Sequence, residues 1–390
     1  MLALFLIAFV DILSFGMIFP LLPDLKIIYN LNDIQSGYLV SSFAVMALIG
    51  SPIFGILSDK FGRKVVLAVP TLLAAVCYFL TIYATTFTEL LILRSLTGFF
   101  TANFPAAFAA VADKTDSSNR FKAMGYLGIA FSLGFVIGPA FGGFLSNVNF
   151  DLVSNITKSN SSVLQFPFIM ATLLSLISAL LVIFAFKETL PKNKRTNTNK
   201  SSLLKQLLGL LNNKTIIFFT YLTVFMNLIF AALEVYLSLY LNDRFKLNSF
   251  DIGLYWAIFA VCITFSQMIG PRLFKTKPAL MVGFITFGVA IIGLVFVNNY
   301  LTLLFLTVFF SFSLGIIFTS ITAGISLQGP ANQQGAIFGI NQLFGNLGRV
   351  VGPYIIGLIY TLNHSFAWIA LGSASLITVL FVLKIVKPKD

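Results

Sequence analysis

The feature that most constrains this chain is a series of apolar stretches, each about 20 residues long, that recurs along its entire length. A helix of about 20 apolar residues crosses the hydrocarbon core of a bilayer. Only helices and closed barrels satisfy their backbone hydrogen bonds in lipid, and runs this long and apolar indicate helices. We therefore predict an all-α integral membrane protein with twelve transmembrane helices, over residues 2–23, 35–57, 65–84, 87–112, 122–146, 165–187, 215–241, 249–271, 279–297, 300–326, 334–360 and 364–386.

The net charge of +12 is distributed in a way that argues against nucleic-acid binding. With the N-terminus inside, nearly all basic residues fall in cytoplasmic loops, and the opposite loops hold only Lys26, Lys158, Arg244 and Lys246. An excess of Lys and Arg in cytoplasmic loops is the positive-inside rule. The distribution predicts that both termini are cytoplasmic.

A polar segment over residues 188–213, rich in Lys, Asn and Thr, divides the chain and is predicted to be a cytoplasmic linker. The sequences on either side repeat one another. Five Gly and Pro positions recur at one constant offset: Gly125, Gly134, Gly138, Pro139 and Gly143 as Gly339, Gly348, Gly352, Pro353 and Gly357. Parallel repeats of spans are a known transporter architecture. We expect two six-helix bundles, over residues 1–187 and 214–390.

Asp11 is the lone acid of an otherwise apolar first span. A carboxylate at a helix centre costs about 2.5–3.5 kcal/mol on insertion scales, so it needs a partner, a cavity or a proton. A role in proton coupling is favoured over a purely structural salt bridge. Arg94 lies in the fourth span and stays charged, so it cannot carry the proton. It can instead hold an acid ionised, bind a substrate carbonyl or carboxylate, or bond backbone carbonyls.

Glu234 and Arg349 are the other intramembrane charges, in the seventh and eleventh spans. Glu234 has three open roles: taking a proton, binding a cationic substrate, or pairing with Arg349. Asn227 aligns with Asp11 across the repeat, where an amide replaces the acid. Further polar and aromatic side chains of the second half are candidates for a substrate cavity: Tyr236, Trp256, Gln267, Asn341, Gln342 and Asn346.

A basic, glycine-punctuated loop is predicted at residues 55–64, between the second and third spans. Gly55 allows two helices to approach, and Gly62 suits a tight turn. Asp59 is placed to meet either Arg63 or the positive N-terminal end of a helix from the other half. A solvated loop that only sets topology explains Arg63 and Lys64 but leaves the two glycines unexplained.

The fifth span carries a stripe of small residues at four-residue spacing: Gly134, Gly138 and Gly142, with Pro139 and Gly143 beside them. Such spacing allows close helix contact, and proline kinks the helix. Ordinary membrane packing accounts for a single such pair. The length of the stripe favours a hinge or seal, with Gly348, Gly352 and Pro353 as its counterparts.

With these motifs in place, the chain resembles the major facilitator superfamily, and within it the twelve-span drug:proton antiporters that include tetracycline-resistance exporters. The 55–64 loop matches the superfamily's loop pattern at Gly55, Leu57, Ser58, Asp59, Lys60, Gly62, Arg63 and Lys64. The stripe resembles the antiporters' fifth-helix signature. Leu90, Arg94, Thr97 and Gly98 resemble their fourth-helix motif, and Asp11 with Pro20 and Pro23 resembles their first helix.

The resemblance implies two pseudo-symmetric bundles and a 55–64 latch that closes the cytoplasmic side. It implies proton-coupled export of small amphiphilic organic compounds by alternating access, with the ionisable groups mainly in the first half. Together with the residues themselves, this gives Asp11, Arg94 and Glu234 as the expected coupling residues. A flippase for lysolipid or lipid-linked molecules, or a metabolite facilitator or symporter, is the alternative within transport. A membrane receptor without transport belongs to a different class and is less favoured.

Enzyme chemistry is not indicated. The sequence around Gly209 lacks the second glycine of a P-loop, and a single histidine offers no metal cluster. We expect no cofactor beyond a proton gradient, no enzyme activity and no nucleic-acid partner. The expected setting is a bacterial plasma (inner) membrane, with the protein as a monomer in the lipid bilayer.

Overall fold

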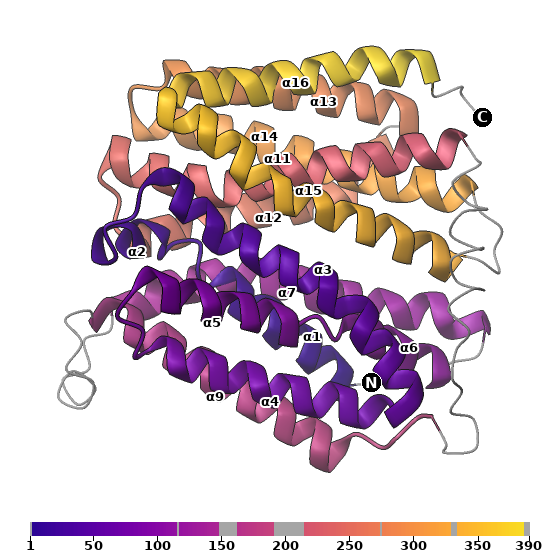
Figure 1. Cartoon of the computed structure of the whole chain (residues 1–390). Coiled ribbons are helices and arrows are strands. Elements are labelled where there is room, and N and C mark those ends of the chain that lie inside the picture. The colour runs from indigo at the N-terminus through magenta and orange to yellow at the C-terminus, as the bar shows by residue number, and fades with distance from the viewer. Residues whose placement is uncertain are drawn as a thin grey trace. The chain divides into compact units, whose positions relative to one another are not determined.

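The computed structural model describes residues 2–114, 117–147, 162–190, 214–273, 275–328 and 334–385 (Figure 1). Within these ranges the chain forms helices and no strands. The helices of the first half are α1 (Leu2–Gly16), α2 (Leu22–Ile28), α3 (Asp33–Phe61), α4 (Arg63–Thr81), α5 (Phe87–Phe100), α6 (Phe104–Lys114), α7 (Ser117–Ser146) and α9 (Ser162–Ala185). Those of the second half are α11 (Lys214–Phe245), α12 (Ser249–Leu273), α13 (Thr276–Gly293), η2 (Leu294–Phe296), α14 (Tyr300–Gln328), α15 (Gln334–Leu362) and α16 (His364–Ile385).

Nine of the helices in the described ranges are long and apolar enough to cross a membrane, and α1 and α7 add shorter apolar stretches, Leu4–Gly16 and Leu133–Ser146. Every predicted span corresponds to one of the helices above or to two consecutive ones. Many large apolar side chains stay exposed, with Phe184 at 82% and Leu301 at 78%. Exposed apolar surface of this kind is what a helix in contact with lipid requires.

Two predicted spans are interrupted. The first helix ends at Gly16, and residues 17–21 form turns before α2 begins. The fourth span is divided into α5 and α6 by turns at residues 101–103. Proline disfavours helical geometry in the residue before it, and Pro20 and Pro105 lie at these breaks. The Asn103 side chain uses the second break to donate a hydrogen bond to Thr71 Oγ1 at 3.1 Å.

The chain divides into two compact units, Met1–Thr198 with Leu247–Ala257, and Asn199–Lys246 with Ile258–Asp390. The first turns of α12 therefore belong with the first unit. The predicted linker lies outside the described residues over 191–213. The bundle boundaries drawn from the sequence stay a prediction.

The same helix pairs recur inside each unit. In the first unit α1 packs on α7, α3 on α5, and α4 on α9. In the second unit α11 packs on α15 and α13 on α16, and Gly315 of α14 lies against α12. Figure 1 shows α4 beside α9 in the first unit and α13 beside α16 in the second. The repeat in the sequence therefore corresponds to equivalent helix–helix contacts in the two units.

Glycines make the closest of these contacts possible. A Cβ atom added at Gly134 would lie 2.6 Å from the Phe9 carbonyl oxygen, and one at Gly138 would lie 2.6 Å from that of Leu13. In α15 the equivalent glycines abut the backbone of α11: Gly348 at Val224 and Gly352 at Leu228. The backbones of α1 and α7 therefore touch where any side chain would intervene.

We expect Gly138→Ala to lower the free energy of unfolding by about 1–3 kcal/mol, because the added methyl group must displace the α1 backbone. The matched control is Gly55→Ala inside α3, where the nearest atom to an added Cβ lies at 3.8 Å. The control should be neutral or slightly stabilising, since alanine has the better helix propensity. Thermal unfolding in detergent measures both variants, and equal stability would refute the close α1–α7 packing.

Candidate functional site

Asp11 of α1 is buried in the first unit, with only 4% of its surface exposed. Its Oδ2 atom is buried and has no hydrogen-bond partner. Buried polar atoms are nearly always hydrogen-bonded, so one that is not calls for a water, an ion or a proton. The carboxyl group of Asp11 is therefore in an environment that disfavours a permanent charge.

Arg94 is also buried at 4% exposure, and its guanidinium is held by aromatic rings. Its Cζ atom lies 4.6 Å from the ring centroid of Phe43 and 5.5 Å from that of Phe15. Cation–π contacts of this kind stabilise a buried cation. Phe15 follows Asp11 by one helical turn, so α1 contributes both the acid and a ring that holds the arginine.

Tyr78 of α4 joins this group and was not predicted from the sequence. It is 2% exposed and lies within electrostatic range of both Arg94 and Asp11. The hydroxyl groups of Tyr78 and Ser14 are neighbours, yet neither makes a hydrogen bond of normal geometry. A site with several buried polar groups that lack hydrogen-bond partners can hold a bridging water molecule. No sequence signal separated Tyr78 from the other aromatic residues of its span.

Glu234 and Arg349 form the corresponding charged group in the second unit. Arg349 Nη2 donates to both carboxylate oxygens of Glu234, at 2.8 Å and 2.7 Å. Glu234 is fully buried, and the Arg349 guanidinium also lies 5.9 Å from the ring centroid of Phe230. Of the three roles left open for Glu234, pairing with Arg349 is the arrangement present in the structure.

Other cavity candidates of the second unit lie along α11 and α15. Tyr236 is buried and donates to the Pro353 carbonyl oxygen at 2.6 Å. Asn227 donates to the Thr223 carbonyl oxygen at 2.9 Å, and its side chain lies against Gly345. Three further amide side chains are partly exposed: Gln267, Asn341 and Asn346. The Gln342 side chain lies outside those that the structure describes.

Two placements differ from the expected alignment. The glycine contacts between α7 and α1, and between α15 and α11, put Met226 rather than Asn227 at the level of Asp11. Trp256 lies in the part of α12 that belongs to the first unit, with its ring centroid 5.8 Å from that of Phe19. The α11 residue at the level of Asp11 is therefore an apolar one, and Trp256 packs within the first unit.

The 55–64 segment, predicted as a loop, is mostly helical. Residues 55–61 complete α3, Gly62 adopts a positive φ of 102°, and α4 begins at Arg63. A positive φ of this size is a conformation that glycine tolerates best. Arg63 is 7% exposed and pairs with Asp59 at 2.6 Å, which is the first of the two partners expected for Asp59.

Two acids that the sequence did not single out complete this cluster. Asp113, at the end of α6, pairs with Arg63 Nε at 3.2 Å. Glu188, just beyond α9, accepts hydrogen bonds from the backbone N–H groups of Arg63 and Lys64, at 2.9 Å and 3.2 Å. A carboxylate at a helix N-terminus satisfies free N–H groups and favours the helix dipole. In the sequence, the one feature that marks Asp113 and Glu188 is that each follows an apolar span.

Burial would raise the pKa of the Glu188 carboxyl group, but hydrogen bonds from the backbone N–H groups of Leu190, Arg63, Lys64 and Thr189 outweigh it. The pKa of Glu188 therefore lies below its ordinary value. The carboxylate form is the one that holds the start of α4.

The glycine stripe of α7 faces two partners inside the first unit. Gly134, Gly138 and Gly142 abut the α1 backbone, while Gly143 abuts Ser249 and Gly253 at the start of α12. Ser249 Oγ in turn donates to the Pro20 carbonyl oxygen at 2.8 Å and is hydrogen-bonded to Asp24. The stripe thus packs two helices at once.

The family model described as Major Facilitator Superfamily matches the chain over residues 4–279 and 272–390. The chain belongs to the Major Facilitator Superfamily. It is 29% identical over 374 residues to "Multidrug resistance protein 2" of Bacillus subtilis (strain 168), covering 93% of this chain and 89% of that protein. It is 29% identical over 372 residues to "Tetracycline resistance protein, class B" of Escherichia coli, covering 92% and 87%.

The fold agrees with solved structures of the superfamily. A bacterial homologue of the human lysosomal transporter Spinster, solved in an inward-facing and unoccupied conformation, superposes with a TM-score of 0.81. The two sequences are 16% identical, and the match covers 98% of this chain and 94% of that one. The predicted family and major facilitator fold are confirmed. This superfamily member is a multi-pass membrane transporter and not an enzyme.

For the charged pair of the second unit, we expect Arg349→Ala to cost about 3–5 kcal/mol of stability, because it leaves the buried Glu234 carboxylate uncompensated. The double variant Glu234→Gln, Arg349→Met should recover most of that loss, since an apolar replacement of a buried ion pair is often neutral. Thermal unfolding of the single and double variants measures this. If the double variant is as unstable as Arg349→Ala, the lost stability comes from packing and not from an uncompensated Glu234 charge.

For the first unit, we expect Glu188→Gln to lower the melting temperature at pH 7. A lowered pKa in the folded state contributes stability above the unfolded pKa and loses it as pH falls through the folded pKa. The difference from the natural protein should therefore shrink below about pH 4, under the ordinary pKa of glutamate. Asp243→Asn, an exposed acid at the end of α11, is the control. A pH-independent difference would contradict the capping role.

Proposed function

We propose that this protein exports small amphiphilic organic compounds in exchange for protons, by alternating access. The observation that carries the proposal is the environment of Asp11, a buried acid whose Oδ2 atom has no hydrogen-bond partner and which lies within electrostatic range of Tyr78. The relatives named as multidrug and tetracycline resistance proteins support the substrate class.

Asp11 is the proposed proton carrier. In the proposed cycle the Asp11 carboxyl group is protonated while its Oδ2 atom is buried without a hydrogen-bond partner. Water or a polar substrate group that entered the site would favour the ionised form. Exchange of a proton for a substrate at one acid couples the two fluxes without any covalent chemistry.

Arg94 is proposed to keep a positive charge beside the carrier. Its guanidinium stays protonated and contacts the rings of Phe43 and of Phe15, which follows Asp11 by one helical turn. When Asp11 loses its proton, the nearby cation limits the energy of the resulting charge. Tyr78, within electrostatic range of both, has a hydroxyl group that can donate to or accept from the acid in either state.

Glu234 carries a smaller share of the proposed coupling. Its carboxylate is already compensated by Arg349, so protonation of Glu234 requires that pair to separate. In the second unit, the proposed substrate cavity is lined by Asn227 and Tyr236 on α11 and by Asn346 on α15. Arg349 is the group there that suits a substrate carboxylate or carbonyl.

The 55–64 segment is proposed to act as a latch on the cytoplasmic side, with Asp59 breaking and remaking its contacts during the cycle. The glycine stripe of α7 is proposed as the packed surface about which α1 and α12 move. The proposed setting is the bacterial inner membrane, with both termini cytoplasmic and a monomer as the working unit. The proposed bundles cover residues 1–187 and 214–390, and a cytoplasmic linker over 188–213 joins them.

We expect Asp11→Asn to fold and insert normally but to lose at least about tenfold in gradient-driven accumulation, because an amide cannot carry the proton. The measurement uses proteoliposomes with an imposed pH difference and a fluorescent amphiphilic dye. Asp33→Asn, the same change at an acid paired with Lys26, is the control and should transport like the natural protein.

The same assay separates the alternatives. A natural protein whose dye flux ignores the pH difference would be a facilitator or a flippase, and one without flux would be a receptor. Uphill transport by Asp11→Asn at the natural rate would remove Asp11 from the coupling mechanism.

A further inference from the structure

The break between α5 and α6 in the first unit holds a buried polar group that the proposed coupling mechanism does not use. Asn103 lies in this break, and only 1% of its surface is exposed. Its amide nitrogen donates to Thr71 Oγ1 at 3.1 Å, whereas its Oδ1 atom is buried without a hydrogen-bond partner. Buried side-chain oxygens are nearly always hydrogen-bonded, so this one indicates a ligand that donates a hydrogen bond.

Water is the ligand that fits this group. The Thr71 hydroxyl group accepts from Asn103 and donates to the Leu67 carbonyl oxygen at 2.8 Å, so any further bond to it must come from a donor. A metal cation requires more oxygen ligands than these two side chains offer. Ala102 and Ala106, on either side of Asn103 in the chain, are buried and apolar. The group therefore suits a small neutral donor, and a buried water molecule typically makes about three hydrogen bonds.

The register of α1 against α4 gives the depth of Asp11. The Ser14 side chain neighbours Tyr78, and toward the other end of the two helices Leu4 and Leu67 belong to one buried cluster. The two helices therefore run in the same direction. Because Asp11 precedes Ser14 by about one helical turn, it lies about one turn before the level of Tyr78.

The contact between Asn103 and Thr71 lies between the levels of Asp11 and Arg63. Thr71 precedes Tyr78 by about two helical turns, so it lies about 5 Å beyond the level of Asp11, and Arg63 lies about 12 Å further along α4. Over this distance α1, α4 and α6 offer no charged side chain, since none occurs in residues 2–10, 65–81 and 104–112. A proton that leaves Asp11 along these helices toward Arg63 therefore needs water to carry it.

Apolar side chains lie between this polar group and Arg63. They come from α1, α4 and α6 and are buried in one cluster that includes Leu4, Ile7, Leu67, Ala106, Ala110 and Val111. Tightly packed apolar side chains exclude water, so the cluster acts as a seal. A water molecule held on the Asp11 side of this seal can exchange a proton with the acid without opening a leak.

We propose that Asn103 and Thr71 bind a water molecule that receives the proton of Asp11 on its way to the proposed cytoplasmic side. The inference rests on the proposed role of Asp11 as the proton carrier. The O–H bond of the protonated carboxyl group breaks and a new O–H bond forms on the water, which passes another of its protons to water beyond the seal once the seal opens. Asp11 is left as a carboxylate, and the bound water is regenerated. Asn103 is a positioning residue, because its Oδ1 atom holds the water and takes no proton itself.

Asn103→Leu tests the site, because leucine has a similar volume and no polar side-chain atom. In proteoliposomes, dye export driven by a pH difference should fall at least about tenfold, since the proton leaves Asp11 without a positioned acceptor. Exchange of labelled for unlabelled dye at equal pH requires no proton release and should be unchanged. Unchanged pH-driven export would overturn the proposal. An equal fall in both rates would make Asn103 a purely structural residue and would overturn it as well.

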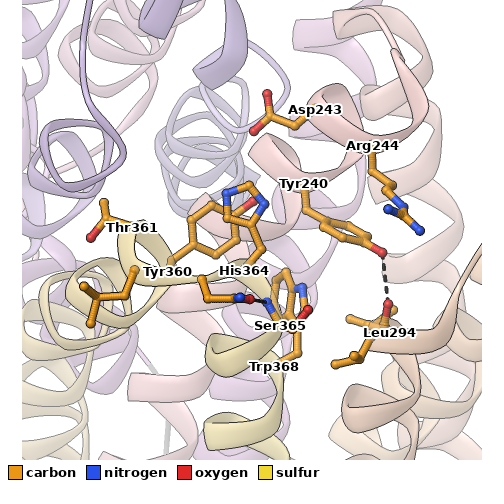
Figure 2. A pocket seen from close by; sticks show the side chains of 12 residues that line it. Tyr240, Asp243, Arg244, Leu294, Tyr360, Thr361, His364, Ser365 and Trp368 are labelled. Atoms are coloured by element: carbon orange, nitrogen blue, oxygen red, sulfur yellow. Dashed lines mark hydrogen bonds between the residues drawn. The ribbon is translucent and has the colours of Figure 1, made fainter.

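Trp368→Phe is the matched control in the second unit. The Trp368 indole nitrogen is also buried without a hydrogen-bond partner, and the side chain lines a pocket to which Asp243 and Arg244 bring opposite charges (Figure 2). The substitution removes this nitrogen and keeps an aromatic ring. Both rates should match those of the natural protein. A loss of pH-driven export as large as that of Asn103→Leu would show that the effect is not specific to the Asn103 site, and the proposal would be wrong.

Infrared difference spectra between acidic and neutral pH detect the water without transport. The natural protein should show an O–H stretching band that shifts in heavy-oxygen water, and Asn103→Leu should lack it. A band that persists in Asn103→Leu, or its absence from the natural protein, would overturn the site. If export by the natural protein ignores the pH difference, the proposed function fails instead, and the infrared band still decides whether Asn103 holds water.

Discussion

The contact between the backbones of α1 and α7 is the constraint on which the rest of the first unit depends. Gly134 and Gly138 bring α7 so close to α1 that the carbonyl groups of Phe9 and Leu13 fill the space of a side chain. Asp11 lies between those two residues on α1. Its depth in the unit is therefore set by packed backbone, which is far stiffer than a side-chain contact. The same device recurs between α15 and α11.

The two units use this shared packing for different charge arrangements. In the second unit Glu234 is fully compensated by Arg349 through two hydrogen bonds. In the first unit Asp11 has an uncompensated oxygen, and Arg94 is held by Phe15 and Phe43. A compensated pair is costly to separate, whereas an uncompensated acid responds to small changes in its surroundings. The repeat therefore yields one rigid and one responsive charged group, and this difference supports placing the proposed coupling in the first unit.

Features that are local in the sequence could be predicted, and features that need a distant partner could not. The spans follow from apolar runs, and Gly62 followed by Arg63 marks the turn between α3 and α4. The capping of α4 by Glu188 joins residues 125 apart, so no local pattern announces it. Tyr78 likewise gains its place beside Asp11 only through tertiary packing. The one-residue shift between Asn227 and the level of Asp11 arises because α11 and α15 set their own register, which depends on where glycines meet carbonyl groups.

The Arg63 cluster gives a physical reason why the proposed latch can open. Arg63 is buried, so losing a sole carboxylate partner would leave an uncompensated cation and would cost several kcal/mol. Arg63 has two acidic partners, however, and Asp113 on α6 contacts Nε while Asp59 contacts Nη1. Glu188 meanwhile holds the backbone at the start of α4. Asp59 can therefore exchange its contacts while Arg63 keeps a counter-charge and α4 keeps its cap. A segment with this redundancy can change partners without unfolding the turn that carries it.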